Sequence, residues 1–238
     1  MVRGKGRSEI YGVVISWFKD KKRGLVLDCP AGTGYLAMEL AKLGYSVMCG
    51  EIDPKVFEIP DIPCIYIDMT KEIPFSDGYF DYVLCVEGLE HTTDPYKAVS
   101  EMSRVLKDGG YAIFTIPNYC NMEKRIKYVL TGYLTRPKSI KEYRERGNLY
   151  DFHNTPLTIT VLDFILAVND LQIVSIMKEK TKVRQLLFYP LVLVLWIFSF
   201  FLSEEVKNRR RTDLTLKPEV IMGGNTLIVV AKKMRKAS

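Results

Sequence analysis

Apolar runs of strand length alternate with amphipathic stretches over the first half of the chain. The runs lie at Gly24–Cys29, Ser46–Ile52, Cys64–Ile67, Phe80–Val86 and Tyr111–Ile116. Between them apolar residues recur with helical spacing, most clearly over Gly34–Leu43 and Pro95–Leu106. Buried strands that alternate with helices are typical of a mostly parallel sheet with helices on both faces. The pattern therefore predicts an α/β fold.

This alternation breaks after Asn118. The stretch 119–157 is basic and rich in tyrosine, with a helix expected over Met122–Leu134. A connection between a strand and a helix normally takes only a few residues, so we interpret 119–157 as a functional insertion, such as a lid over a substrate. The regular pattern then resumes with one helix and two strands, expected at Thr158–Val168, Gln172–Met177 and Thr226–Ala231.

The charges divide the chain in a similar way. The 238 residues carry a mild net charge of +6, but the stretch 24–118 holds 6 basic and 15 acidic residues, so its flanks are basic. The flanks are either ordinary solvated lysines or a surface that faces phosphates or an anionic membrane. We interpret residues 1–23 as a basic helical extension. Residues 24–238 are expected to form one domain with insertions at 119–157 and 184–211.

A glycine-containing loop follows the first predicted strand. It reads Asp28-Cys29-Pro30-Ala31-Gly32-Thr33-Gly34 and leads into a helix. Glycines there let backbone N–H groups approach a ligand at the N-terminus of the helix. The acid that opens the loop has no counterpart in the G-x-G-x-x-G run of dinucleotide-binding loops. A carboxylate at this place would repel a pyrophosphate, and it suits a ligand that carries an ammonium group.

The loop resembles the D/E-x-G-x-G-x-G motif of the class I S-adenosylmethionine-dependent methyltransferases. Pro30 replaces the first glycine, which removes one N–H donor and fixes φ, whereas Gly32 and Gly34 are retained. Two later stretches strengthen the resemblance, the I-P-F and F-D residues of 73–81 and the L-K-D-G-G turn of 106–110. The resemblance implies a Rossmann-like sheet of about seven strands, mostly parallel with an antiparallel last strand.

The resemblance also implies which residues bind the cofactor, S-adenosylmethionine. Glu51 at the end of the second strand would accept both ribose hydroxyls, with Asp53 as the alternative, and Ile52 would pack on the adenine. Asp68 would contact the adenine edge together with the backbone beside it. The full set expected at the cofactor is Asp28, Pro30, Ala31, Gly32, Gly34, Glu51, Ile52, Asp68, Met69 and Glu87.

Candidate catalytic residues follow the fourth predicted strand. The run 87–91, Glu-Gly-Leu-Glu-His, is similar to the E-x-x-E-H motif of the ubiquinone-biosynthesis O-methyltransferases. Methyl transfer from a sulfonium needs alignment and, for a hydroxyl acceptor, removal of a proton. His91 is the candidate general base, because imidazole titrates near neutral pH. Alternatively, Glu87, Glu90 and His91 hold a divalent cation of the Mg²⁺ type, or Glu90 and His91 cap a helix.

The second histidine, His153, lies near the end of the tyrosine-rich insertion. Its stretch 153–158 resembles the H-x-x-x-x-T entry to a helix in type 11-like methyltransferases, including those that act on glycans and lipids. In that family the loop closes over the active site, so His153 joins His91 and Glu87 as a catalytic candidate. A loop histidine that is hydrogen-bonded to the backbone is the structural alternative.

Leu186–Leu202 contains no charged residue. Its 17 residues fall just short of the roughly 20 that a membrane-spanning helix needs. The strands on either side of it are expected in the same sheet, so both ends must stay on one side. We therefore expect a re-entrant or in-plane helical hairpin, kinked near Pro190, with basic flanks that suit anionic lipid headgroups. A buried helix or a homodimer interface is the alternative.

The sequence thus predicts an S-adenosylmethionine-dependent methyltransferase that acts on a small-molecule, glycolipid or polyprenyl-type hydroxyl at the membrane surface. A catalytically weak cofactor-binding scaffold or partner subunit is the alternative. A nucleic-acid partner is not expected, because no N/D-P-P-Y/F tetrapeptide follows the fourth strand and no catalytic cysteine pair is present. The five cysteines form no C-x-x-C pair and no secretory signal opens the chain, so we expect a cytoplasmic, membrane-associated protein.

Overall fold

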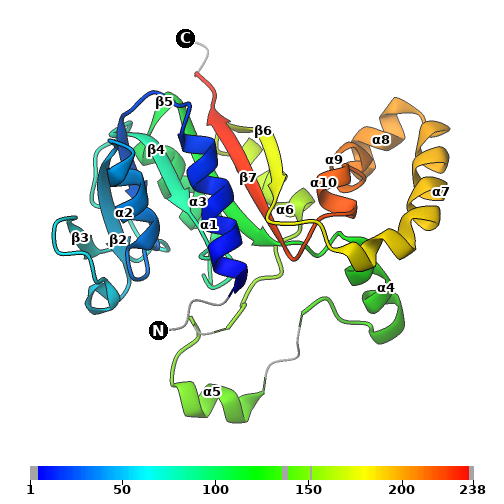
Figure 1. Cartoon of the computed structure of the whole chain (residues 1–238), viewed down its shortest axis with the longest axis horizontal. Helices are drawn as coiled ribbons and strands as arrows, with labels where there is room; N and C mark the ends of the chain where they lie inside the picture. The colour runs from blue at the N-terminus through cyan, green and yellow to red at the C-terminus, as the bar shows by residue number, and fades with distance from the viewer. Residues whose placement is uncertain (1–4, 136–138, 151, 236–238) are drawn as a thin grey trace.

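The computed structural model describes residues 5–135, 139–150 and 152–235 and contains one sheet in the order β3-β2-β1-β4-β5-β7-β6 (Figure 1). The strands are β1 Leu25–Asp28, β2 Ser46–Glu51, β3 Cys64–Tyr66, β4 Phe80–Cys85, β5 Leu106–Pro117, β6 Leu171–Lys178 and β7 Thr226–Lys233. β1 to β5 pair in parallel, and β7 runs antiparallel to both of its neighbours. The predicted Rossmann-like sheet is confirmed.

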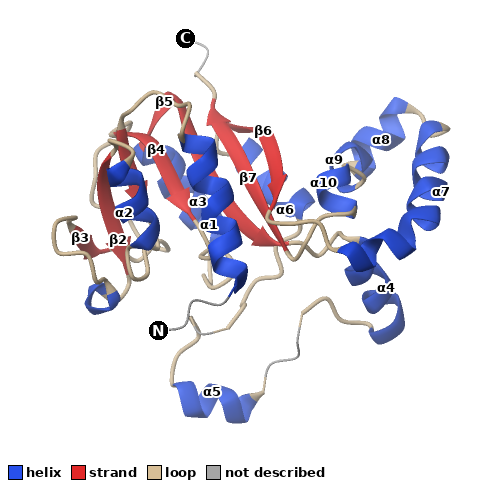
Figure 2. Cartoon of the chain, viewed as in Figure 1, coloured by secondary structure: helices blue, strands red, loops and turns tan. Residues whose placement is uncertain are grey.

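Helices cover both faces of this sheet (Figure 2). They are α1 Lys5–Phe18, α2 Tyr35–Lys42, α3 Pro95–Val105, α4 Met122–Thr131, α5 Ile140–Arg146, α6 Ile159–Ala167, α7 Tyr189–Phe200, α8 Glu204–Arg210, α9 Thr212–Thr215 and α10 Pro218–Ile221, with 3₁₀ turns η1 Pro54–Val56 and η2 Val183–Phe188. Side chains alternate along the strands, so Leu27 and Val83 pack against α3 and α6, whereas Val26 and Leu84 pack against α1 and α2. Two apolar cores therefore sandwich the sheet.

The basic extension at 1–23 contributes directly to one of these cores. Val14 and Phe18 of α1 are fully buried, and they pack in one cluster with Ile113, Ile228 and other residues of the sheet. The α1 helix therefore packs as part of the same folded unit as the sheet.

Several element boundaries differ from the sequence prediction for local reasons. β5 starts at Leu106, five residues early, because Leu106 already pairs with Phe80 before a register shift. α4 ends at Thr131 because Gly132 adopts a φ of +70° and its N–H bonds to the carbonyl of Tyr128. The short helix α5 was not predicted.

The apolar segment lies between β6 and β7, which are hydrogen-bonded neighbours in the sheet. The chain leaves β6, forms η2 and α7, and returns through α8, α9 and α10, with α7 at the edge of the molecule farthest from β3 (Figure 1). The expected kink at Pro190 is wrong. Pro190 stands in the first turn of α7, where no intrahelical N–H is needed, and it begins the helix.

Candidate active site

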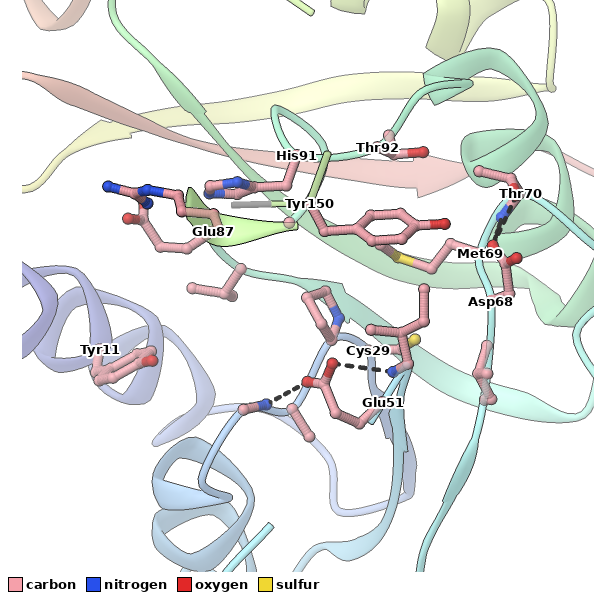
Figure 3. A pocket seen from close by; sticks show the side chains of 18 residues that line it. Tyr11, Cys29, Glu51, Asp68, Met69, Thr70, Glu87, His91, Thr92 and Tyr150 are labelled. Carbon is pink, nitrogen blue, oxygen red and sulfur yellow. Dashed lines mark hydrogen bonds between the residues drawn. The ribbon is translucent and has the colours of Figure 1, made fainter. Parts of the chain in front are cut away.

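A cavity of about 430 Å³ opens where β1, β2, β3 and β4 end (Figure 3). The residues that follow the carboxyl ends of parallel strands form its wall, which is the usual place for a ligand in such sheets. Eight of the ten residues expected at the cofactor line it, namely Pro30, Ala31, Gly32, Glu51, Ile52, Asp68, Met69 and Glu87. Asp28 and Gly34 do not line the cavity. Residues of the glycine-containing loop and the acids Glu51, Asp68 and Glu87 therefore line the same cavity.

Glu51 links the end of β2 to the glycine-containing loop. Its carboxylate accepts one hydrogen bond from the Gly32 N–H at 2.8 Å and another from the Ile52 N–H at 2.9 Å (Figure 3). Gly32 adopts a φ of +54°, which favours glycine and turns its N–H toward this carboxylate. Glu51 is therefore fixed in orientation, and each carboxylate oxygen keeps acceptor capacity for a diol.

The proline that departs from the motif is packed into the cavity wall. The Pro30 ring lies against Gly88, where a Cβ atom would overlap the ring. Gly34 is packed as tightly against Phe57 and Ile59 behind the loop. The loop therefore keeps its close backbone approach to the cavity in spite of the substitution at position 30.

Asp28 sits directly behind this wall. Its side chain is 1% exposed, and its Oδ2 has no hydrogen-bond partner among the residues that the structure describes. Burial, and secondarily the charge of Glu51, raise the pKa of Asp28 to about 8. Burial therefore favours the protonated form of Asp28, which lies behind the cavity wall and does not line it.

Asp68 presents a carboxylate on the opposite side of the cavity. Its Oδ1 accepts hydrogen bonds from the Thr70 N–H at 3.0 Å and the Thr70 hydroxyl at 2.6 Å, and Lys71 lies 3.6 Å from Oδ2. Burial would raise the pKa of Asp68, but the Thr70 hydrogen bonds and the Lys71 charge outweigh it and lower the pKa. Asp68 is an ionised acceptor at neutral pH.

A second cavity of about 440 Å³ adjoins the first. It is lined by Glu87, Glu90, Pro117, Tyr119, Lys124, Leu134, Thr135, Glu142, Arg146, Phe152, His153, Asn225 and Thr226. Glu87 and Arg146 line both cavities, so the two spaces meet at these residues. Such a pair of cavities can hold two reactants side by side.

The two histidines meet where the cavities adjoin. His91 lines the first cavity and His153 the second, and their rings contact edge to face with centroids 4.8 Å apart. Partial burial, together with the adjacent His91, lowers the pKa of His153. A neutral imidazole, able to accept a proton or bind a metal, is therefore favoured at position 153.

The grouping of metal-ligating side chains differs from the predicted one. Glu90, His91 and His153 come together with one ligand atom of each within 4.8 Å of the others. Glu87, which the sequence placed in this set, is not part of it. His153 replaces it because the loop after α5 brings residues 153–155 against the 90–92 turn, with the Asn154 N–H bonded to the Glu90 carbonyl at 2.7 Å.

Glu87 occupies a strained position between the two cavities. Its φ is +56°, a conformation that is uncommon for a residue with a side chain, and its N–H donates to the hydroxyl of fully buried Thr115 at 2.7 Å. Strain of this kind persists where surrounding structure holds it, and functional sites are a frequent location. The positive φ and the position between two cavities make Glu87 a stronger functional candidate than its sequence motif alone did.

Sequence reasoning missed several residues of the first cavity, and three of them come from segments outside the predicted motifs. Tyr11 reaches the cavity from α1 and Tyr150 from the residues after α5 (Figure 3), and Arg146 is the last residue of α5. Arg146 supplies the permanent positive charge among the described residues of this wall. The basic charge and tyrosine content of 1–23 and 119–157 were the available signals, but no local motif marked these residues.

Comparison with known proteins agrees with this geometry. Residues 27–114 match the family model described as a methyltransferase domain. Residues 27–114 therefore resemble a methyltransferase domain. A solved S-adenosylmethionine-dependent methyltransferase from Archaeoglobus fulgidus shares the fold, with a TM-score of 0.58 and 18% identity over 94% of each chain.

Curated relatives match about half of the chain. The demethylmenaquinone methyltransferase of Renibacterium salmoninarum is 34% identical over 47% of this chain and 48% of its own length. The ubiquinone biosynthesis O-methyltransferase of Nitrosomonas europaea is 28% identical over 50% of this chain and 55% of its own. The chain therefore spans about half the length of these curated relatives.

Proposed function

We propose that the protein transfers a methyl group from S-adenosylmethionine to a hydroxyl of an amphiphilic acceptor. The single observation that carries this proposal is the meeting of two cavities at Glu87, one lined by the methyltransferase motif residues and the other by His153. The cofactor supplies a methyl group that its sulfonium already activates. The protein has to orient both reactants and accept one proton.

The donor set of the first cavity fits this cofactor. Glu51 is held by two backbone N–H groups in an orientation that suits a ribose diol, and Ile52 offers an apolar surface to the adenine. Ionised Asp68 suits an exocyclic amino group. Arg146 would pair with the carboxylate of the methionine portion, since it brings the permanent positive charge to the described part of the wall.

The acceptor hydroxyl would enter from the second cavity. His91, His153 and Glu87 all lie where the two cavities adjoin, so each is within reach of a hydroxyl placed between them. A histidine in its neutral form takes the proton most readily, and the lowered pKa of His153 favours that form. We assign the proton to the His91–His153 pair and the orientation of the acceptor to Glu87.

A divalent cation at Glu90, His91 and His153 is a second candidate for activation of the hydroxyl. Two imidazoles and one carboxylate are a common ligand set for divalent transition metals. Titration of the protein with Zn²⁺ and Mg²⁺, with His153→Ala as the comparison, tests this alternative. Binding that His153→Ala leaves unchanged would exclude the cluster.

We place the reaction at a membrane surface. Val183–Phe200 has the length and composition of a membrane-crossing helix, with a mean hydropathy of 1.8 and 11% of its residues buried. Both ends of this stretch return to adjacent strands, so an in-plane position is favoured over a crossing one. Exposed Arg184 before α7 and the basic residues of α8 after it suit anionic headgroups.

Isothermal titration with S-adenosylmethionine tests the first half of this proposal. Glu51→Gln loses the charged acceptor for the ribose and is expected to weaken binding at least tenfold, which corresponds to about 1.4 kcal/mol. Glu58→Gln, the same change at an exposed residue of the neighbouring loop, is expected to bind like the unaltered protein. Absence of binding to the folded, unaltered protein would refute the proposal.

Transfer of a labelled methyl group to lipid and phenol extracts tests the second half of the proposal, the methylation of an acceptor hydroxyl with the histidines as base. His91→Ala and His153→Ala are each expected to lower the rate at least a hundredfold while the cofactor still binds, since general-base catalysis contributes about that much. Undiminished transfer in both variants would show that neither histidine takes the proton.

A further inference from the structure

One wall of the second cavity is built from hydrogen-bond donors. Lys124 comes from α4, while Asn225 and Thr226 stand at the start of β7, and all three line the second cavity and not the first. Lys182 donates to Asn225 Oδ1 at 2.6 Å. Because an ammonium can only donate, this contact fixes the amide oxygen of Asn225 toward Lys182 and leaves its NH₂ group as a donor for a ligand.

Lys124 brings a positive charge to this wall. Its ammonium makes no ion pair in the described part of the chain, and the adjacent carboxylate of Glu123 binds Lys182 and Arg184 at 2.8 Å each. Partial burial and the charges of Lys127 and Lys182 lower the pKa of Lys124 and outweigh the opposing charge of Glu123. A ligand with negative charge would relieve both the desolvation and the repulsion at this ammonium.

The acids of the cavity come from other elements. Glu87 and Glu90 follow β4, and Glu142 lies on α5. Glu87 also faces the first cavity, where the cationic cofactor of the proposed reaction would sit. Of these acids Glu87 alone also lines the first cavity, and among the described lining residues from α4 and the start of β7 the charged one is Lys124.

The same cavity has an apolar side. Leu134 and Phe152 line it, and Val129 and Leu130 in the last turn of α4 are 82% and 78% exposed. A ligand that fills the space would thus have a charged end against Lys124 and an apolar part along Leu134 and Phe152.

We propose that the methyl acceptor is an anionic amphiphile, whose phosphate or carboxylate group is bound by Lys124 and the amide NH₂ of Asn225. This inference rests on the proposed methyl transfer and names the acceptor's chemical class. Tyr119 supports it as a further donor in the same wall, because its hydroxyl is buried without a hydrogen-bond partner in the described residues. Burial, with the nearby Glu90, raises the pKa of Tyr119 to about 12, so the hydroxyl keeps its proton.

Binding of three probes to the full chain tests this assignment by titration calorimetry. The probes are geranyl phosphate, geraniol and inorganic phosphate, each measured with S-adenosylmethionine present. Geranyl phosphate is expected to bind at least tenfold more tightly than geraniol. Lys124→Met is expected to weaken the binding of geranyl phosphate about tenfold, which is the effect of losing one charge-assisted hydrogen bond.

Lys141→Met is the matched control, because it removes the same charge from an exposed lysine of α5 that lines neither cavity. If inorganic phosphate binds as tightly as geranyl phosphate and depends on Lys124, the site binds a small soluble anion and the assignment of an amphiphilic acceptor is overturned. Equal affinity for geraniol and geranyl phosphate, or an equal effect of the two lysine variants, would overturn the inference. Cofactor titration of the same samples separates this failure from failure of the proposed function.

Discussion

Asp28 combines deep burial with a carboxyl group that has one unpartnered oxygen, and this has a consequence for stability. Its folded-state pKa is raised from 3.8 to about 8. Between these values the unfolded chain releases the proton while the folded chain keeps it. The free energy of unfolding therefore falls as pH rises through this range, by at most about 1.4 kcal/mol per pH unit from this group.

Asp28→Asn is expected to remove this pH dependence, since an amide has nearly the shape of the protonated carboxyl. Urea unfolding at pH 5, 6, 7 and 8 measures it. The variant should gain stability relative to the unaltered protein as pH rises. Titratable groups that both proteins share contribute equally to the two unfolding free energies, so their contributions cancel in the difference. A constant difference across the four pH values would show that Asp28 is ionised in the folded chain.

At the scale of elements, α7 exposes apolar side chains around most of its circumference. Val192 is its buried residue, whereas Ile197 and Phe200 are 60% and 79% exposed. Replacement of these two by Gln is expected to weaken binding to phosphatidylglycerol vesicles at least a hundredfold, because each loses the burial of a large apolar side chain worth about 1.5–3 kcal/mol. The melting temperature in water should change little, because both residues already contact solvent.

Vesicle flotation measures this effect, and Ile140→Gln on α5 is the control because Ile140 is exposed away from α7. A protein that floats equally well with and without the two α7 substitutions would contradict the membrane assignment. Loss of a dimer on size exclusion, without any vesicle binding in the unaltered protein, would show that α7 serves as an interface between two copies.

At the scale of the whole molecule, the first helix and the last strands share one core. Trp17 of α1 packs edge to face on Tyr82 and Tyr111 of the sheet, and Lys180 after β6 pairs with Glu9 at 2.6 Å. We therefore expect residues 5–235 to unfold as one cooperative unit.

The two tryptophans allow a direct measurement. In a Trp196→Phe variant, the fluorescence of Trp17 should change at the same urea concentration as far-UV circular dichroism. Phe18→Ala should move both transitions together to lower urea concentration. The free energy of unfolding should fall by about 3–5 kcal/mol, because Phe18 is fully buried. A fluorescence transition that precedes the dichroism transition would mean that α1 detaches independently. Lys19→Ala, at an exposed neighbour, controls for the helix end.

Local patterns predicted much of this molecule correctly. The strands before residue 118 follow from short apolar runs, and Glu51 and Asp68 were placed at strand ends by motif and order alone. Both features depend on residues close together in the chain, so one sequence is enough to read them. The position of Pro190 could not be predicted in the same way. A proline either bends a helix or stands in its first turn, and the choice depends on the surrounding fold, which here places Pro190 in the first turn of α7.

The sequence by itself determined the α/β sheet, the glycine-containing loop after β1 and the apolar segment, because periodicity and motif spacing are local. Only the tertiary structure decided which side chains share a cavity. Arg146 and His153 lie more than fifty residues from Glu87 in the chain, and although a motif marked His153 as a candidate, no local pattern showed that the insertion brings both residues to the cavity that Glu87 lines. Their positions follow from packing and backbone hydrogen bonds between distant loops, such as that from Asn154 to Glu90. Contacts of this kind depend on the whole fold, and no short stretch of sequence encodes them.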